Sequence, residues 1–141
     1  MILPFNFEEL RALRAGARSL LGRHPATPDA PVLAPSESRA RLESLEPRLT
    51  GDLSLGTLAE LRGVEAAVAA IVEYLRAEME ARVVTTHPAG EEAVAAYFDF
   101  AHALSAQHRL EGLSAEMTAL AEVVTGRPVD EETARTFRFP D

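Results

Sequence analysis

The chain has 141 residues, of which 47% are hydrophobic and 6% aromatic, and this apolar content suffices for one globular domain. All 14 basic residues are Arg, and the chain contains neither Lys nor Cys. The composition therefore excludes a phosphate-binding or Schiff-base lysine, thiolate catalysis, thiolate metal sites and disulfides.

The net charge of −8 is unevenly distributed. Residues 1–50 hold seven Arg and six acidic residues, whereas residues 51–141 hold seven Arg and sixteen acidic residues. An acidic domain repels phosphate backbones at long range, which argues against a nucleic-acid partner. No stretch approaches the roughly 18 apolar residues of a membrane span, and no cationic start precedes an apolar run. We therefore expect an acidic, cytoplasmic protein without a membrane partner.

The first predicted element is a helix over residues 7–21. Asn6 can act as its N-cap, and Glu9 follows three residues later, as in a capping box. Apolar residues that include Leu13 and Leu20 then recur at helical spacing. The pattern therefore predicts an amphipathic helix that buries its leucine face.

The next stretch, residues 23–35, is rich in proline. Its four prolines forbid a regular helix and favour an extended backbone. Connections of this length are uncommon within compact domains. Residues 1–22 could therefore act as an arm that docks on another subunit.

Two further helices are predicted in the middle of the chain. Ser36 can cap a short helix that ends near Pro47. Thr57, with Glu60 three residues later, opens a helix that runs to about Val83. This long helix is the strongest element that the sequence predicts.

The long helix has two distinct faces. A core-facing stripe consists of large apolar residues at helical spacing: Leu61, Val64, Val68, Val72, Leu75 and Met79. A strip of small residues lies opposite: Ala59, Gly63, Ala66, Ala70, Ala77 and Ala81. Small side chains let a second helix approach closely. We therefore predict an interface with another subunit or a partner protein that includes Leu13, Leu20, Gly63, Ala66, Ala70 and Ala77. The alternative is that alanine fills a solvent-facing side because of its helix propensity.

Residues 91–110 form the next predicted helix. Apolar and aromatic residues gather on one wide face of this helix, together with one histidine: Val94, Tyr97, Phe98, Phe100, Ala101, Leu104 and His108. A helix with so wide an apolar face is expected to lie centrally in its bundle.

Glycines divide the rest of the chain. Gly112 is predicted to break the helix, and a new helix is predicted over residues 114–125, with Ser114 as its cap and Gly126 as its terminator. Asp130 then opens a last short helix.

No segment shows the period-two alternation of a half-buried strand over a useful length. The fold class predicted for residues 1–141 is therefore all-α. We expect a single domain, a five- to six-helix bundle with two long antiparallel central helices.

The four candidate residues for catalysis form two pairs at i,i+3 spacing: Asp99 with His102, and His108 with Glu111. The chain lacks Glu-x-x-His and His-Glu-x-x-His, the patterns of di-iron bundles and zinc hydrolases. Each pair supplies at most half of a metal site, so a site would need further carboxylates, such as those of Glu65 or Glu73. We therefore predict no bound metal or cofactor. A metal-assisted or acid-base hydrolase between the long helices is the alternative.

Arg11, Arg14 and Arg18 lie within one sector of the first predicted helix. They could bind an anion or nucleic acid through charge-assisted contacts. We favour the other interpretation, in which they form a solvated rim or pair with the acidic remainder of the chain.

Arg82 and His87, separated by four residues, resemble the Arg-x4–6-His pattern of HEPN-type RNases, which are also small all-α bundles. The resemblance covers six residues, and Arg18 with His24 fits the same pattern. We therefore carry over no activity from that family.

These features together predict a small helical protein that works without catalysis of its own. We expect it to self-associate, as a homo-oligomer such as a dimer, or to bind a protein partner. Hydrolysis, and anion or nucleic-acid binding, are the alternatives.

Overall fold

The computed structural model describes residues 1–22, 37–85 and 90–140. The helices in these ranges are α1 (Phe7–Gly22), α2 (Glu37–Leu45), the 3-10 helix η1 (Glu46–Arg48), α3 (Leu58–Thr85), α4 (Glu91–Thr125) and α5 (Glu131–Thr136). Apart from two isolated bridges, the described residues form no strand. The all-α prediction is therefore confirmed. The proline-rich stretch 23–35, the predicted cap Ser36, and His24 and His87 lie outside the described residues.

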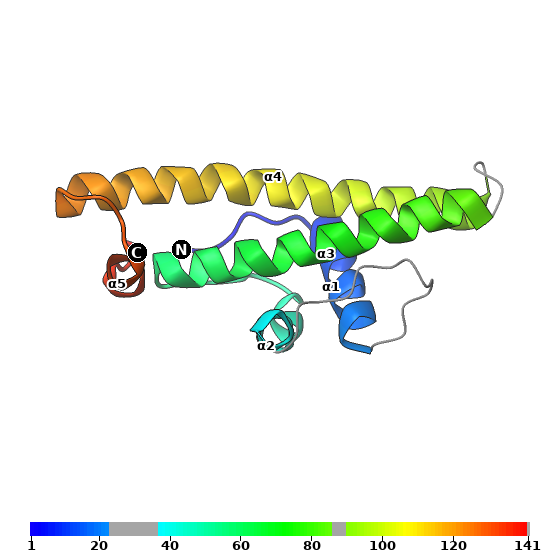
Figure 1. Ribbon diagram of the computed structural model, residues 1–141, viewed down its shortest axis with the longest axis horizontal. Helices are drawn as coiled ribbons and strands as arrows, with labels where there is room; N and C mark the ends of the chain where they lie inside the picture. Colours follow the sequence, from blue (N-terminus) through cyan, green and yellow to red (C-terminus); the bar gives the residue numbers. More distant parts are fainter. Residues whose placement is uncertain (23–36, 86–89, 141) are drawn as a thin grey trace.

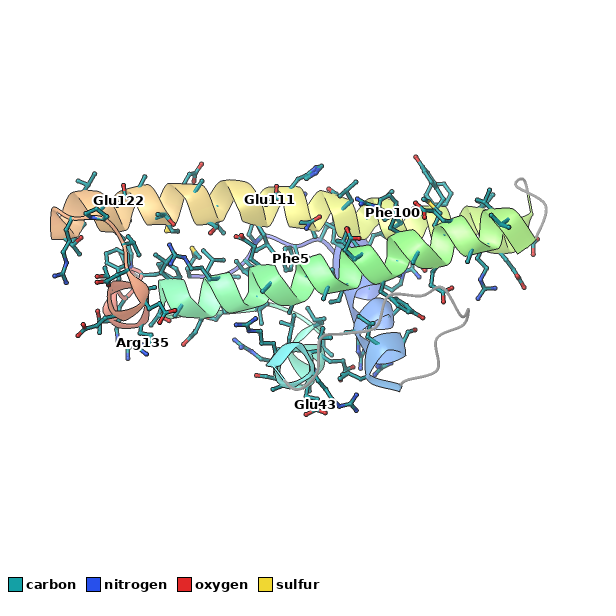
Figure 2. All side chains as sticks on the ribbon, viewed as in Figure 1. Phe5, Glu43, Phe100, Glu111, Glu122 and Arg135 are labelled. Carbon is teal, nitrogen blue, oxygen red and sulfur yellow. The ribbon has the colours of Figure 1, made fainter. Side chains whose placement is uncertain are left out.

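The two long helices α3 and α4 pack side by side in opposite directions and form the main axis of the fold (Figure 1). Helices α1, α2 and α5 all lie on the α3 side of α4 (Figure 1). The guanidinium carbon of Arg76 on α3 lies 5.4 Å from the ring centroid of Phe100 on α4, which links the two helices. Phe100 is labelled in Figure 2. No helix within the described ranges has the length and apolar composition needed to cross a membrane.

The capping pairs that the sequence predicts are present. Asn6 and Glu9 form a reciprocal capping box, in which each side chain accepts a 2.8 Å hydrogen bond from the other residue's backbone N–H. At the start of α3, Thr57 accepts a hydrogen bond from the N–H of Glu60, 3.2 Å, and Glu60 accepts one from the N–H of Gly56. Local side-chain pairs therefore fix the starts of α1 and α3.

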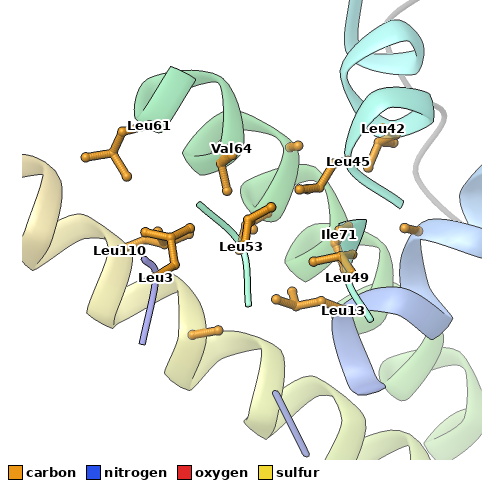
Figure 3. Close-up of a cluster of buried hydrophobic side chains, with 14 of the residues drawn as sticks. Leu3, Leu13, Leu42, Leu45, Leu49, Leu53, Leu61, Val64, Ile71 and Leu110 are labelled. Atoms are coloured by element: carbon orange, nitrogen blue, oxygen red, sulfur yellow. The ribbon is translucent and has the colours of Figure 1, made fainter. Parts of the chain in front are cut away.

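The core lies where α3 meets α1, α2, α4 and the segment that precedes α3. The predicted α3 stripe is buried except for Met79, which is half-buried. Figure 3 shows how leucines from several elements meet this stripe, among them Leu3, Leu13, Leu42, Leu53 and Leu110. Because these leucines come from segments far apart in the sequence, the core ties the whole described chain together.

Helix α1 docks on the core of its own chain. It packs against α3 and α4, and its residues Leu13 and Leu20 are buried there. A Cβ built on Gly16 would lie 2.6 Å from Cγ2 of Ile71, so α1 comes closer to α3 than any side chain at position 16 would allow. Residues 1–22, the possible arm for another subunit, thus pack on the core of their own chain in this structure.

Both ends of the chain pair with residues 53–58, immediately before and at the start of α3. The N–H of Leu3 donates to the carbonyl of Leu53, and the N–H of Phe139 donates to the carbonyl of Gly56, both at 2.9 Å. These bonds satisfy backbone groups in segments that lack regular structure.

Helix α4 runs without a break through Gly112, so the predicted division into two helices is wrong. A glycine inside a helix costs about 1 kcal/mol relative to alanine. On either side of it, Leu110 and Ala121 are fully buried, and Leu113 and Met117 pack against the core. This packing outweighs the local cost. The helix ends instead at Gly126, which has φ of 71° and the predicted role of terminator.

The face of α4 that packs inward overlaps only in part with the wide apolar face, from which Phe100 and Leu104 pack against the core. The buried residues of α4 are mostly alanines: Ala93, Ala103, Ala106, Leu110 and Ala121. Val94, Tyr97 and Phe98 are 41%, 55% and 53% exposed. Small side chains let α4 pack closely against α3 and α1, which leaves the larger residues outside.

The N-cap of α5 gives a prediction about acid stability. The carboxylate of Asp130 accepts a 2.7 Å hydrogen bond from the backbone N–H of Thr133. This bond lowers the pKa of Asp130 below its usual value of 3.8. Because the pKa is lower in the folded protein, this contribution to stability is complete above the unfolded pKa and is lost as the pH falls through the folded one.

The variant Asp130→Asn keeps an oxygen acceptor but does not titrate. We therefore expect its Tm to fall less than that of the wild type between about pH 5 and pH 2. Thermal unfolding followed by circular dichroism measures the difference. Equal losses of Tm in the two proteins would contradict this role of the cap.

Candidate functional site

Of the four candidate catalytic residues, Asp99 is the one that lines a pocket between described helices. Its carboxylate lies 3.5 Å from a guanidinium nitrogen of Arg11 on α1, so its ion-pair partner is not His102. His102 is half-buried, and His108 and Glu111 are exposed. The two predicted pairs are therefore not assembled around one pocket.

The structure also tests the proposed additional ligands. Glu73 is exposed and pairs with Arg76 at 3.2 Å, and Glu65 is half-buried. Within residues 1–22, 37–85 and 90–140, no three His, Asp or Glu residues form a group that could hold a metal ion.

The three arginines of α1 pair with carboxylates. Arg14 and Arg18 both approach Oε1 of Glu46, with nitrogen–oxygen distances of 3.5 and 2.8 Å. Arg11 pairs with Asp99, as described above. The favoured interpretation, pairing with the acidic remainder of the chain, thus holds for Arg11, whereas Arg14 and Arg18 pair with a carboxylate of the first 50 residues.

The strip of small residues on α3 lies at the margin of the core. Gly63, Ala70 and Ala77 are half-buried, and Ala66 is exposed. No atom of the described chain lies within 4 Å of a Cβ built on Gly63. Leu13 and Leu20, the other predicted interface residues, are buried inside the chain.

A second surface, on α4, was not predicted. We call it the outer face. Its members are separated alternately by four and three residues, except that the last interval is again four: Val94, Phe98, Ala101, Ser105, His108, Gly112, Ala115, Ala119 and Val123. All are exposed except the half-buried Ala101, and none is an acid or an arginine. Tyr97 adjoins it and makes an edge-to-face contact with Phe98 at 5.7 Å. The interval is typical of a helix that packs along a second helix.

A pocket of about 490 Å³ lies on the opposite side of α4, between α1, α3 and α4. Its apolar wall includes Leu75 and the alanines Ala15, Ala95 and Ala96. Its charged residues are three carboxylates and one guanidinium: Glu78, Glu92, Asp99 and Arg82.

A chain of hydrogen bonds crosses the polar wall of this pocket. The hydroxyl of Tyr74 donates to Oε1 of Glu78, 3.0 Å, and Nε of Arg82 lies 3.5 Å from Oε2 of the same carboxylate. Arg82 also donates to Oε2 of Glu92, 2.9 Å, which joins α3 to α4. Tyr74 and Glu78 are 5% and 8% exposed. The buried part of this wall, formed by Tyr74 and Glu78, is therefore a fixed arrangement, whereas Glu92 at its end is exposed.

The pocket perturbs two of its titratable groups. Burial raises the pKa of the Tyr74 hydroxyl above its usual value of 10.0, and the hydrogen bond to Glu78 and its charge act in the same direction. The hydrogen bond to Glu92 raises the pKa of the Arg82 guanidinium. At neutral pH, Tyr74 is thus a proton donor to Glu78, and Arg82 is a cation held between two carboxylates.

Comparison of the chain with protein families, with curated proteins and with solved structures found no match. Of the two residues that resemble the HEPN pattern, Arg82 belongs to the pocket wall and His87 lies outside the described residues.

The sequence carried a signal for the pocket that our prediction did not use. Tyr74 and Glu78 are four residues apart, so they share one side of α3. That side borders the large apolar stripe, where a polar pair becomes buried if a neighbouring helix covers it.

Proposed function

We propose that this chain is a self-associating helical module that forms an antiparallel homodimer through the outer face of α4. The observation that carries the proposal is the exposure of Val94, Tyr97 and Phe98 at one end of an uncharged face. An exposed apolar patch of this kind marks an interaction surface more often than an isolated exposed residue does.

The outer face is large enough for a specific interface. Helix α4 has 35 residues, which corresponds to a length of about 52 Å and a diameter of about 10–12 Å. Pairing two copies would therefore cover roughly 500–600 Å² on each, and the sum reaches the roughly 1,000 Å² that a specific interface needs.

Side-chain size favours an antiparallel arrangement. The large residues Val94 and Phe98 lie near the start of the outer face, whereas Gly112, Ala115 and Ala119 lie in its second half. A parallel pair would place large residues against large ones and small against small, so the separation of the helices would vary. An antiparallel pair centred on the outer face places Phe98, its largest residue, against Ala119, and it brings only the valines at the two ends, Val94 and Val123, together.

Charge favours the same arrangement. Exposed carboxylates flank the second half of the outer face, at Glu111, Glu116 and Glu122, two of which are labelled in Figure 2. A parallel pair would bring these like charges together. In an antiparallel pair they lie beside the first half of the partner helix, away from one another, and Glu116 lies on the same edge of the face as His102. A two-fold axis also makes such an interface self-complementary and closed, which accounts for a dimer instead of a filament.

The test compares two alanine-to-glutamate variants on different helices. We expect the wild type to have twice the mass of one chain at about 10 μM, and Ala115→Glu to be a monomer, because a buried unpaired carboxylate is strongly unfavourable. Ala66→Glu, on the exposed part of the α3 strip, is the matched control and should remain a dimer. Size-exclusion chromatography with light scattering measures all three masses.

Two results of this experiment would contradict the proposal, and a third would place the interface on another helix. A monomeric wild type, or a dimer that survives Ala115→Glu, would contradict the proposal. Dissociation caused by Ala66→Glu alone would assign the interface to the small-residue strip of α3 instead.

A further inference from the structure

We propose that the pocket between α1, α3 and α4 binds a small aliphatic amine that carries at least two ammonium groups. The pocket lies on the side of α4 opposite the outer face, so this inference does not depend on the dimer. It rests on the size of the pocket, its charge and the free hydrogen-bonding capacity of its walls.

The volume suits a small organic ligand. At about 490 Å³, the pocket lies within the range of about 300–1,000 Å³ typical of small-molecule sites. Its walls come from three helices that pack against one another, so the shape is set by the fold itself. Such a site is already formed before a ligand arrives, which lowers the entropic cost of binding.

The charge of the walls selects a cation. Three carboxylates face one guanidinium in the pocket, and Arg11, the ion-pair partner of Asp99, adds a second positive charge beside it, so the group still carries a net negative charge inside a chain of net charge −8. The guanidinium of Arg82 already binds both Glu78 and Glu92. An anionic ligand would compete with these carboxylates for Arg82 and would be repelled by Asp99.

The walls offer acceptors at two depths. Glu78 lies deep in the pocket, and its carboxylate has about four acceptor positions, of which Tyr74 and Arg82 use one each. Asp99 is half-buried and Glu92 exposed, so their carboxylates lie nearer the mouth. One ammonium group can therefore bind at Glu78 and a second at Asp99 or Glu92 through charge-assisted hydrogen bonds.

The apolar wall fits the carbon chain of such an amine. Leu75 and three alanines line the pocket beside the carboxylates. Methylene groups between two ammonium groups can pack against these side chains, which removes apolar surface from water. A compact inorganic cation would leave this part of the pocket unused, and no group of described residues could hold a metal ion.

The experiment is isothermal titration calorimetry of the full chain with 1,4-diaminobutane. We expect saturable binding, and no binding of 1,4-butanediol or succinate, which have the same carbon chain without positive charge. Glu78→Gln should weaken the binding of the diamine by about tenfold or more, because it removes the buried charge that accepts one ammonium group. Asp99→Asn, nearer the mouth, should weaken it as well and provides a second variant if Glu78→Gln does not fold.

Glu73→Gln is the matched control, because it removes one negative charge from the exposed side of α3 and should leave the affinity unchanged. Binding that Glu73→Gln weakens as much as Asp99→Asn does would show a general attraction to an acidic protein and would overturn the inference. Failure of the wild type to bind the diamine at about 1 mM would overturn it too. The Ala115→Glu variant should bind the diamine normally, so loss of the dimer and loss of the ligand site are separable results.

Discussion

Gly16→Ala is expected to lower the free energy of unfolding by about 1–3 kcal/mol, although alanine is ordinarily the better helix former. The new Cβ would lie 2.6 Å from Cγ2 of Ile71 and 3.4 Å from the side chain of Leu75. Cγ2 belongs to the β-branch of isoleucine, and a β-branched side chain in a helix has one strongly preferred rotamer. The methyl group therefore cannot move aside without a shift of α1 or α3.

Urea unfolding measures this effect, and Gly63→Ala is its control. Gly63 lies inside α3 with no described atom within 4 Å of the added Cβ, so alanine there should stabilise the protein by up to about 1 kcal/mol. Combining Gly16→Ala with Ile71→Leu should reduce the cost of the alanine, because leucine branches one carbon further out. If Gly16→Ala stabilises the chain as Gly63→Ala does, the close approach of α1 to α3 is wrong.

Arg109→Ala is expected to lower the free energy of unfolding by about 2–4 kcal/mol. Arg109 donates to Oε1 of Glu9 at 2.6 Å and also to the carbonyl of Pro4. Glu9 is fully buried, and its second oxygen, Oε2, has no hydrogen-bond partner among the described residues. Without Arg109, the buried carboxylate of Glu9 would keep one hydrogen-bond donor among the described residues, the N–H of Asn6.

A double-mutant cycle identifies the cause of this loss. Glu9→Gln removes the buried charge, so Arg109→Ala should cost less in that background than in the wild type. The control Arg62→Ala removes the same charge from an exposed position on α3 and should change stability by no more than about 0.5 kcal/mol. Equal costs for Arg109→Ala in both backgrounds would exclude the ion pair as the reason.

The sequence predicted those parts of the fold that depend on neighbouring residues. The starts of α1, α3 and α5 were predictable because each cap joins residues three positions apart, such as Asn6 with Glu9 and Asp130 with Thr133. The buried stripe of α3 was predictable because a large apolar residue returns at each turn. These caps and this stripe are found in the folded chain as predicted because no contact with a distant segment opposes them.

The inward face of α4 was not predictable by the same means. Two sets of residues recur at helical spacing along it, one of alanines such as Ala103 and Ala106, the other of larger residues such as Tyr97 and Phe98. Hydrophobicity favours the larger set, but close packing against α3 selects the alanines. The length of α4 was misjudged for a related reason, because contacts on both sides of Gly112 outweigh a local preference.

The candidate sites were harder still to predict. The pair of Glu9 and Arg109 joins residues 100 positions apart, and the pocket combines side chains from three helices. The four residues chosen for catalysis shared one helix, and proximity along a helix did not bring them into one pocket. The pairing of Arg11 with Asp99 was anticipated only in kind, from the opposite charges of the two parts of the chain. Glu46, which pairs with Arg14 and Arg18, lies in the same part of the chain as these arginines.

The alanines that join α4 to its neighbours affect how the hairpin of α3 and α4 is stabilised. An alanine side chain has no rotamers to lose on burial, so packing α4 against its neighbouring helices costs little side-chain entropy. Each alanine also buries a small area, so no single contact dominates and stability accumulates over many turns. Contacts of this kind stabilise the hairpin only when there are many of them, so α3 and α4 need to be long. Shortening the two helices would weaken their contact in proportion to the turns removed.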